Sequence, residues 1–340
     1  MRKIFILFIL LISLSCEKET GPFSVNYDFS FPTEEKPVAV AVDMLNEIIY
    51  VANYNNSKTN YSSKIQKFNR NGELLKTIVD FTTFDQGKYS RYIPVDICYN
   101  PIYPGNLFVL VKPCQISGET WIPLKGFCIL IFDLLDKFKR EYDYSTFEQE
   151  GYPSFSTMAY SFNCLYVSNG FIIKMIALTS DIVEEISIQT IRDKSDSTTY
   201  SLVTDMEIDS QRIIYFTGQG IPDIVDSTMN DNSGCHVTKI DLQKSQLQTF
   251  YSKARTGTIA SQPNNPGLAI SKAGYIYLAT CYGMSLEVYD RNNDLILQED
   301  ISSIAGEKTR PIDIALGDYR IYVVDNFYNQ VRVFKYKEYD

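Results

Sequence analysis

The stretch "PIDIALGDYRIYVVDNFYNQVRVF" at residues 311–334 decides the interpretation of the fold, because a similar stretch, "PVAVAVDMLNEIIYVANYNN", begins at residue 37. Each copy holds two short runs rich in β-branched and aromatic residues, separated by a polar turn. Such runs are typical of β-strands, and the turn between them predicts an antiparallel hairpin. The same structural unit therefore occurs near the beginning and near the end of the chain.

The second strand of this unit recurs along the whole sequence. Its six copies are "IIYVAN" at residue 48, "LFVLVK" at 107, "LYVSNG" at 165, "IIYFTG" at 213, "YIYLAT" at 275 and "RIYVVD" at 320. Each copy follows another strand-like run and precedes a third, such as "KIQKFN" or "SLEVYD", and a fourth follows a polar turn. The spacing of roughly 45–60 residues is close to the ~40–50 residues of a propeller blade. The sequence thus predicts an all-β fold, a six-bladed β-propeller of four-stranded antiparallel blades.

Two stretches also resemble the NHL repeat. "KIQKFNRNGELLKTI" at residues 64–78 is similar to the end of such a repeat, and residues 311–334 are similar to a nearly whole one. The resemblance is close in the first, fifth and last blades and loose in the middle three. It implies a propeller but no single activity, because propellers of this type serve as binding platforms, lyases and lactonases alike.

The last repeat supplies only three strands before the chain ends. "SVNYDFSF" at residues 24–31 belongs to no repeat, and it alternates apolar with polar residues, which predicts a strand with Val25, Tyr27, Phe29 and Phe31 on one face. An unpaired sheet edge would expose backbone donors and acceptors. We therefore predict that this N-terminal strand completes the last blade and closes the ring.

The N-terminus resembles a bacterial lipoprotein signal. Two basic residues precede an apolar run at residues 4–14, which is shorter than the ~20 residues needed to span a bilayer but long enough for a secretory signal. The sequence "SLSC" then places a small residue directly before Cys16. The resemblance implies that residues 1–15 are removed and that Cys16 is lipidated. An ordinary cleaved signal peptide is the alternative.

The same resemblance implies a location. Glu17 follows the cysteine, which implies sorting to the outer membrane, on its periplasmic or cell-surface side. We expect residues 16–22 to form a lipidated tether and residues 23–340 to form a monomeric propeller that contacts the membrane through its lipid alone. A formal net charge of −9 argues against a nucleic-acid partner.

Loop lengths predict a recognition surface. In an up-and-down meander, the 1–2 and 3–4 turns of every blade share one face of the ring, here called the short-turn face, and the 2–3 loops and blade connections share the other, the long-loop face. Long segments within blades at 54–63, 112–127 and 218–234, and between blades at 81–92, 145–156 and 252–265, belong to the long-loop face. Aromatic residues and arginines in such loops suit a peptide or a glycan, although a tyrosine-rich chain places tyrosines in loops without function as well. The expected partner-binding residues are Trp121, Tyr89, Arg91, Tyr92, Tyr152 and Arg255.

Carboxylates recur at one position of the predicted first strands. Asp96, Asp205 and Asp313 occupy it in the second, fourth and sixth blades. Because first strands line the channel of a propeller, the three side chains could form a ring of oxygen ligands for a hard cation such as Ca²⁺. The alternative is that each aspartate, at the start of its strand, accepts backbone N–H bonds from the preceding turn.

Signatures of catalysis are few. A single histidine, His236, argues against Ser-His-Asp, Cys-His and multi-histidine metal sites, and the sequence contains no P-loop, HExxH or GxSxG motif. We expect a binding or scaffold module for an envelope protein or glycan, without a cofactor. The alternative is a Ca²⁺-dependent lactonase or lyase that uses the three channel aspartates. Whether Cys114 and Cys128 form a disulfide stays open at this point.

Overall fold

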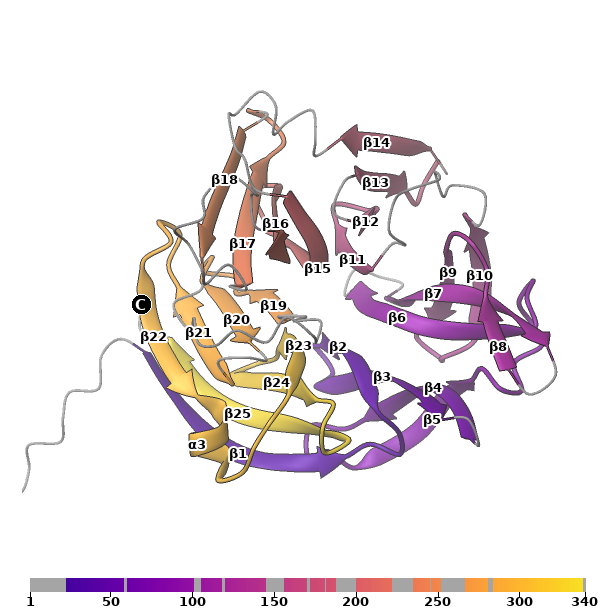
Figure 1. The fold of residues 1–340 in the computed structure, drawn as a ribbon, viewed down its shortest axis with the longest axis horizontal. Helices are drawn as coiled ribbons and strands as arrows, with labels where there is room; N and C mark the ends of the chain where they lie inside the picture. Colours follow the sequence, from indigo (N-terminus) through magenta and orange to yellow (C-terminus); the bar gives the residue numbers. More distant parts are fainter. Residues whose placement is uncertain are drawn as a thin grey trace, which may run out of the picture.

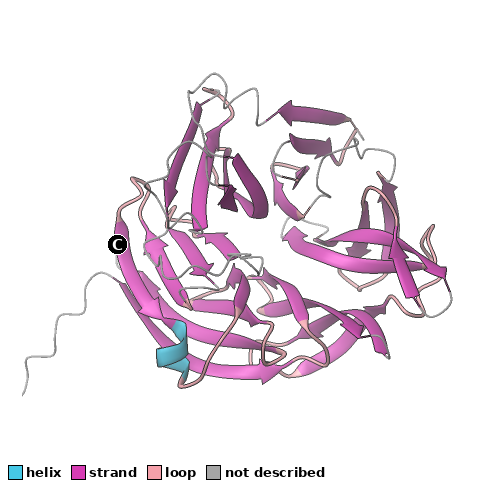
Figure 2. Cartoon of the chain, viewed as in Figure 1, coloured by secondary structure: helices cyan, strands magenta, loops and turns pink. Residues whose placement is uncertain are grey.

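Six antiparallel sheets surround a central axis in the computed structural model of the chain (Figure 1). The structure describes residues 23–57, 60–100, 105–117, 120–144, 156–169, 172–180, 182–187, 200–221, 235–244, 246–251, 267–280 and 284–338. Strands dominate these residues, and the helix drawn among them is the short α3 (Ile301–Ala305) (Figure 2). No helix in this described part of the chain is long and apolar enough to cross a bilayer. The predicted six-bladed, all-β propeller is confirmed.

The first three blades follow one another in chain order, each from its inner to its outer strand. They consist of β2 (Pro37–Asp43), β3 (Ile48–Ser57), β4 (Asn60–Phe68) and β5 (Leu74–Asp80); of β6 (Arg91–Asn100), β7 (Asn106–Ser117), β9 (Cys128–Asp133) and β10 (Phe138–Asp143); and of β11 (Thr157–Ser161), β12 (Cys164–Ser168), β13 (Ile172–Ala177) and β14 (Val183–Ser187). A short extra strand, β8 (Thr120–Pro123), pairs with the end of β7.

The last three blades continue the same pattern. They consist of β15 (Tyr200–Ile208), β16 (Ile213–Ile221), β17 (Cys235–Asp241) and β18 (Gln246–Tyr251); of β19 (Gly267–Ile270), β20 (Ile276–Thr280), β21 (Ser285–Tyr289) and β22 (Leu295–Asp300); and of β23 (Pro311–Leu316), β24 (Arg320–Asp325), β25 (Gln330–Glu338) and β1 (Phe23–Pro32). The first strand of every blade contacts the first strands of both neighbouring blades, so these six strands enclose the axis.

The N-terminal strand closes the ring as predicted. Strand β1 pairs antiparallel with β25, from Phe23 opposite Glu338 to Pro32 opposite Gln330. It is the outermost strand of the sixth blade, whose other three strands come from the end of the chain. Its backbone groups thereby satisfy the edge of β25, which would otherwise be exposed.

The prediction of a single apolar face on this strand is wrong. A bulge at Asp28 shifts the register, so that Tyr27 lies opposite Phe334 while Phe29 lies opposite Val333. Tyr27 therefore packs toward the fifth blade, and Phe29 packs toward the first blade. Because of the one extra residue, apolar side chains that alternate regularly along the sequence point to one neighbouring blade before the bulge and to the other neighbouring blade after it.

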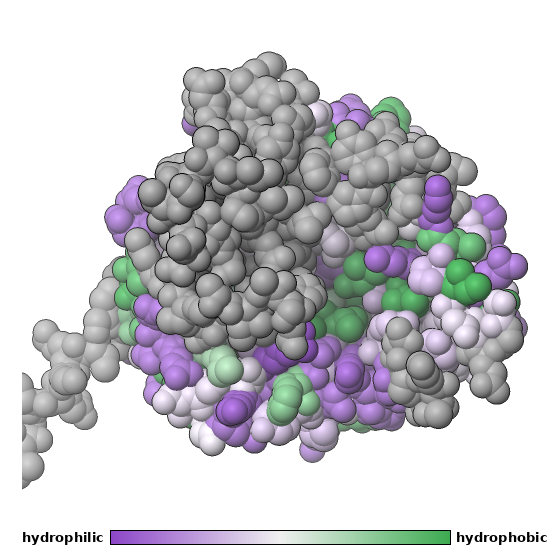
Figure 3. Space-filling model, in the orientation of Figure 1, coloured by the Kyte–Doolittle hydropathy of each residue, from purple (hydrophilic) through white to green (hydrophobic). Residues whose placement is uncertain are grey.

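The hydrophobic core lies between the blades. In the described residues, six clusters of buried side chains each join two neighbouring sheets around the ring. Between the first two blades, for example, Tyr50 packs with Val109 and Leu130. On the face drawn in Figure 3, hydrophobic residues also gather at the surface over the second blade, beside polar ones.

Two segments predicted as long loops are extended hairpins. Strands β3 and β4 continue their pairing as far as Ser57 opposite Asn60, and β7 and β8 continue to Ser117 opposite Thr120. The extra residues of the first two blades therefore project from the long-loop face as paired strands. Paired backbones hold side chains in more defined positions than open loops do.

Candidate functional site

The three channel aspartates occupy equivalent places on the innermost strands. Asp96 lies on β6, Asp205 on β15 and Asp313 on β23, and each directly follows a break in the pairing register of its strand. Such a bulge bends the strand and re-aims the neighbouring side chain. Here the carboxylates reach across to the next blade.

Each carboxylate joins an even-numbered blade to the odd-numbered blade that follows it. In every case the Oδ2 atom accepts a 2.6 Å hydrogen bond from a backbone N–H of the neighbouring first strand. The donors are Met158 for Asp96, Leu268 for Asp205 and Val40 for Asp313. We call Asp96, Asp205 and Asp313 the aspartate ring.

The second oxygen of each carboxylate is also engaged. It accepts a hydrogen bond of 2.7 or 2.8 Å from the backbone N–H of the following residue, Ile97, Met206 or Ile314. The Thr157 hydroxyl lies 3.0 Å from Oδ2 of Asp96 and 3.4 Å from Oδ1 of Asp205, and its single proton is donated to one of them at a time. The alternative role for these aspartates was to accept N–H bonds from the preceding turn. They do accept backbone N–H bonds, but the donors are the following residue and the first strand of the next blade.

A cavity of about 200 Å³ lies along the axis, lined by all six first strands. The aspartate ring forms part of the cavity wall. Toward the short-turn face, the cavity extends as far as Met44, in the turn between β2 and β3. Tyr99, Tyr160 and Glu207 complete the polar part of the lining. The carboxylates are thus grouped inside a narrow channel.

Burial is the main cause of the raised pKa values of the channel carboxyl groups. It raises the pKa of Asp96 to about 7 and, with the charge of Asp96 adding to it, the pKa of Glu207 to about 8. Burial, followed by repulsion from Asp313 and Asp96, raises the pKa of Asp205, and burial followed by the charge of Asp96 raises the pKa of Asp313. At neutral pH the channel therefore retains protons that isolated carboxylates would have released.

The sequence pointed to the aspartate ring but missed Glu207. Glu207 follows Asp205 by two residues on β15, and residues two apart on a strand point to the same side of the sheet. This spacing was the sequence signal that could have identified Glu207 as a channel residue. Among the described residues, no group of three or more His, Cys, Asp or Glu side chains is arranged to hold a metal ion.

A second group of residues lies on the long-loop face. The rings of Tyr61 on β4 and Trp121 on β8 stack with their centroids 5.3 Å apart and an angle of 11° between the planes. The Arg91 guanidinium carbon lies 6.0 Å from the centre of the Trp121 ring, and the exposed Ile116 faces Trp121 across the β7–β8 pair. We call Tyr61, Arg91, Ile116 and Trp121 the aromatic patch. It combines stacked rings, a cation and an apolar side chain from two neighbouring blades.

Tyr92 is not a surface residue, contrary to the prediction. Its side chain is fully buried, and its hydroxyl donates to Glu141 at 3.1 Å and accepts the backbone N–H of Tyr89 at 2.9 Å. Gly87 permits this arrangement, because a Cβ there would lie 2.2 Å from the Tyr92 oxygen. Tyr92 therefore supports the segment that precedes it and makes no contact with solvent.

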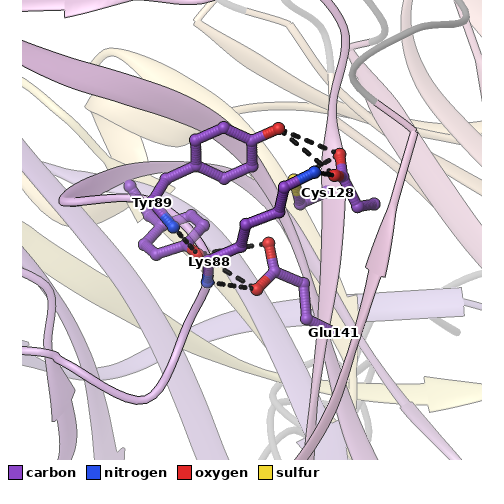
Figure 4. Close-up of polar contacts among 6 residues, drawn as sticks. Lys88, Tyr89, Cys128 and Glu141 are labelled. Atoms are coloured by element: carbon purple, nitrogen blue, oxygen red, sulfur yellow. Dashed lines mark hydrogen bonds and ion pairs between the residues drawn. The ribbon is translucent and has the colours of Figure 1, made fainter.

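Lys88 and Tyr89, in the segment between β5 and β6, contact the outer strand β10 of the second blade (Figure 4). The backbone N–H of Lys88 donates to Glu141 at 2.7 Å, and its ammonium group pairs with Asp143. The half-buried Tyr89 donates its hydroxyl to Asp143 at 3.2 Å. Tyr89 thus belongs to this polar cluster and is separate from the aromatic patch.

Tyr152, Arg255 and Cys16 lie outside the described residues. Cys114 and Cys128 are free thiols, and burial raises the pKa of Cys114 to about 11. The structure thus brings Arg91 together with Trp121, adds Tyr61 and Ile116 to them, and moves Tyr92 into the core.

Comparisons with known proteins bear on the fold. No protein-family model matches the sequence, and no curated protein matches it. The structure is similar to that of a protein of unknown function from Bacteroides thetaiotaomicron, with a TM-score of 0.59 and 10% sequence identity over 93% of this chain and 76% of that chain.

Two further solved structures are similar to the chain in fold. Virginiamycin B lyase from Staphylococcus aureus superposes with a TM-score of 0.53 at 12% identity, over 92% of this chain and 99% of that chain. Raptor from Chaetomium thermophilum superposes with a TM-score of 0.51 at 11% identity, over 91% of this chain but only 28% of that chain. At such identities the likeness concerns the fold alone. The chain is a six-bladed β-propeller similar in fold to virginiamycin B lyase.

Proposed function

We propose that this chain is an NHL-like, lipid-anchored propeller of the bacterial outer membrane that binds a protein or glycan partner through its long-loop face. Cys16 carries the lipid, and the propeller supplies the recognition surface. The observation that carries the proposal is the aromatic patch, which joins the hairpins of two neighbouring blades. No catalytic step is required of such a module.

The chemistry of the aromatic patch suits a partner with a flat apolar surface and hydrogen-bond acceptors. Stacked aromatic rings offer a large contact area at low cost in conformational entropy, and an arginine donates in a plane to carbonyl, carboxylate or hydroxyl oxygens. Tyr61 and Trp121 hold one another in place before any partner arrives. Pre-organisation of this kind favours binding, because less side-chain freedom is lost in the complex.

Capture of envelope components tests this proposal. The double variant Tyr61→Ala/Trp121→Ala is compared with the wild type for binding to solubilised envelope proteins and to arrayed envelope glycans. We expect the variant to lose roughly tenfold or more in affinity for the captured partner, as truncation of central aromatic residues does at interfaces. Tyr319→Ala is the matched control, because Tyr319 is an exposed aromatic residue on the short-turn face. Equal capture by the double variant and the control would contradict the proposal.

A second candidate function is that of a Ca²⁺-dependent lactonase or lyase. The observation that favours it is the grouping of Asp96, Asp205 and Asp313 in the axial cavity, and a lyase is among the neighbours in fold. The backbone bonds to all six carboxylate oxygens weigh against it, because a bound cation would compete with them.

Calcium titration of the purified protein separates the two functions. Under the second function, Ca²⁺ raises the melting temperature, EDTA reverses the change, and Asp205→Asn abolishes it. A melting temperature that is insensitive to Ca²⁺ and EDTA in the wild type leaves the binding module as the remaining proposal.

A further inference from the structure

The register of the closing strand fixes the face from which the N-terminal segment leaves the propeller. Strand β25 begins at Gln330, after the 2–3 turn of its blade on the long-loop face, and it runs toward the short-turn face. Phe23 lies opposite Glu338, the last residue of that strand. Residues that precede Phe23 are therefore attached at the short-turn face.

Exposed apolar side chains gather on this same face. They lie in the 1–2 and 3–4 turns of the first, second, third and sixth blades, and Leu45 and Leu135 are 77% and 69% exposed. The main members are Leu45, Leu134, Leu135, Phe162, Ile182 and Tyr319, here called the apolar turn residues. Clusters of exposed apolar residues mark contact surfaces, whereas single ones are common on any protein.

The apolar turn residues occupy one side of the ring. The sixth blade, which receives the N-terminal strand, carries Tyr319, and the next three blades carry the others. In the fourth and fifth blades, the described turns carry polar residues such as Gln211, Lys272 and Asn292. The apolar part of the short-turn face thus begins at the blade to which the N-terminal segment is attached.

The length of the segment between Cys16 and Phe23 limits how a lipid anchor can orient the propeller. At no more than ~3.6 Å per residue, this segment reaches about 25 Å when fully extended. Strand β1 has 10 residues, and at ~3.3 Å per residue it is about 33 Å tall. The segment is therefore shorter than the blade is tall, so a lipid at Cys16 cannot extend from the short-turn face to a bilayer that lies against the long-loop face.

We propose that the short-turn face rests on the membrane surface and that the apolar turn residues contact lipid. This replaces the expectation from the sequence that the propeller contacts the membrane through its lipid anchor alone. This inference rests on the proposed lipid attachment at Cys16. The occupant of the apolar surface is the bilayer, because the anchor leaves from that face and its reach excludes the opposite orientation. The aromatic patch then points away from the membrane, where a partner has access to it.

The single tryptophan of the chain makes the orientation measurable. The lipidated full-length protein is reconstituted into vesicles of phosphatidylethanolamine and phosphatidylglycerol, with or without bromine on the acyl chains, which quenches tryptophan on contact. Two variants, Leu45→Trp and Leu135→Trp, are each combined with Trp121→Phe. We expect brominated lipid to lower their fluorescence about twofold, because their side chains enter the acyl region, and to leave Trp121 of the wild type unquenched.

Flotation of the vesicles separates failure of the anchor from failure of the orientation. Protein that does not float with the vesicles contradicts lipid attachment at Cys16. Floating protein with equal fluorescence at residues 45 and 135 in both lipids overturns the membrane contact, as it would if a second protein covered this face. Quenching of Trp121 in place of the turn tryptophans also overturns it. Unchanged melting temperatures show that the variants are folded.

Discussion

The carboxylate of Asp313 accepts the backbone N–H of Val40 at 2.6 Å and so joins the sixth blade to the first at the axis of the ring. The outer edge of the same blade is completed by the pairing of β1 with β25. Segments from the two ends of the chain are therefore connected twice, once at the inner and once at the outer edge of the last blade. Asp96 and Asp205 repeat the inner connection at two other blade junctions.

Asp313→Ala is predicted to destabilise the closed ring. The substitution leaves the N–H of the buried Val40 without its acceptor, and an unsatisfied buried donor costs about 1–3 kcal/mol. Denaturant unfolding measures the change as a lower midpoint with an unaltered slope. Asp318→Ala, at an exposed position of the same blade, serves as the control. A variant at residue 313 that is as stable as this control would show that the bond contributes nothing to closure.

Phe31→Ala is predicted to open the outer closure. Phe31 is almost fully buried, packs on Phe68 of the first blade at 4.8 Å between ring centres, and lies against Gly72, where an added Cβ would come within 2.6 Å of it. Removing a buried phenylalanine side chain costs about 3–5 kcal/mol. Asn26→Ala, at an exposed position of the same strand, is expected to change the free energy of unfolding by less than about 0.5 kcal/mol. Comparable losses from both variants would contradict the specific role of Phe31.

The sequence was sufficient to predict the fold because each blade repeats the same local signals. The "IIYVAN"-type strands, their polar turns and the unassigned strand at residues 24–31 together determine the number of blades and the closure. The bulge at Asp28 was not predictable, because a strict alternation of apolar and polar residues looks the same with or without an extra residue in the pairing.

The candidate site was predictable only in part. The equivalence of Asp96, Asp205 and Asp313 follows from the repeat, whereas their 2.6 Å bonds to neighbouring blades depend on how the sheets pack. Tyr92 and Trp121 are both aromatic residues in segments predicted as loops, and the sequence cannot tell that the first is buried beneath Gly87 while the second stacks on Tyr61. Tertiary packing decides between the two outcomes.

Tyr92→Phe is predicted to loosen the Lys88–Tyr89 segment without changing the fold. The substitution removes the hydroxyl that accepts the N–H of Tyr89 and donates to Glu141. We expect faster hydrogen exchange at the Tyr89 amide and a loss of roughly 1–2 kcal/mol in the free energy of unfolding. Tyr319→Phe, at an exposed tyrosine, is the matched control and is expected to leave both quantities unchanged. Unaltered exchange at Tyr89 in the Tyr92 variant would mean that the segment is held by other contacts.

Glu207→Gln is predicted to stabilise the protein at high pH and to leave it nearly unchanged at low pH. The folded state raises the pKa of Glu207 from 4.5 to about 8, chiefly by burial and then by the charge of Asp96. The native state therefore binds this proton more tightly than the unfolded chain does, so its favourable contribution is complete below about pH 4 and is lost as the pH rises toward 8. Glutamine carries no charge to bury, and the expected gain at pH 8 is on the order of 2 kcal/mol once the partial exposure of the half-buried Glu207 is allowed for.

Melting temperatures of the Glu207→Gln variant and the wild type, measured from pH 4 to pH 9, test this dependence. The difference between the two proteins should grow by a few degrees across this range, with most of the change between pH 5 and pH 8. Glu184→Gln, at an exposed position of β14, removes the same formal charge outside the channel and is the matched control. A constant difference for Glu207→Gln would mean that Glu207 titrates alike in the folded and unfolded chains. Among the channel carboxyl groups, the raised pKa values would then be confined to the aspartate ring, where Asp96, with a pKa of about 7, would produce the remaining loss of stability over the same range.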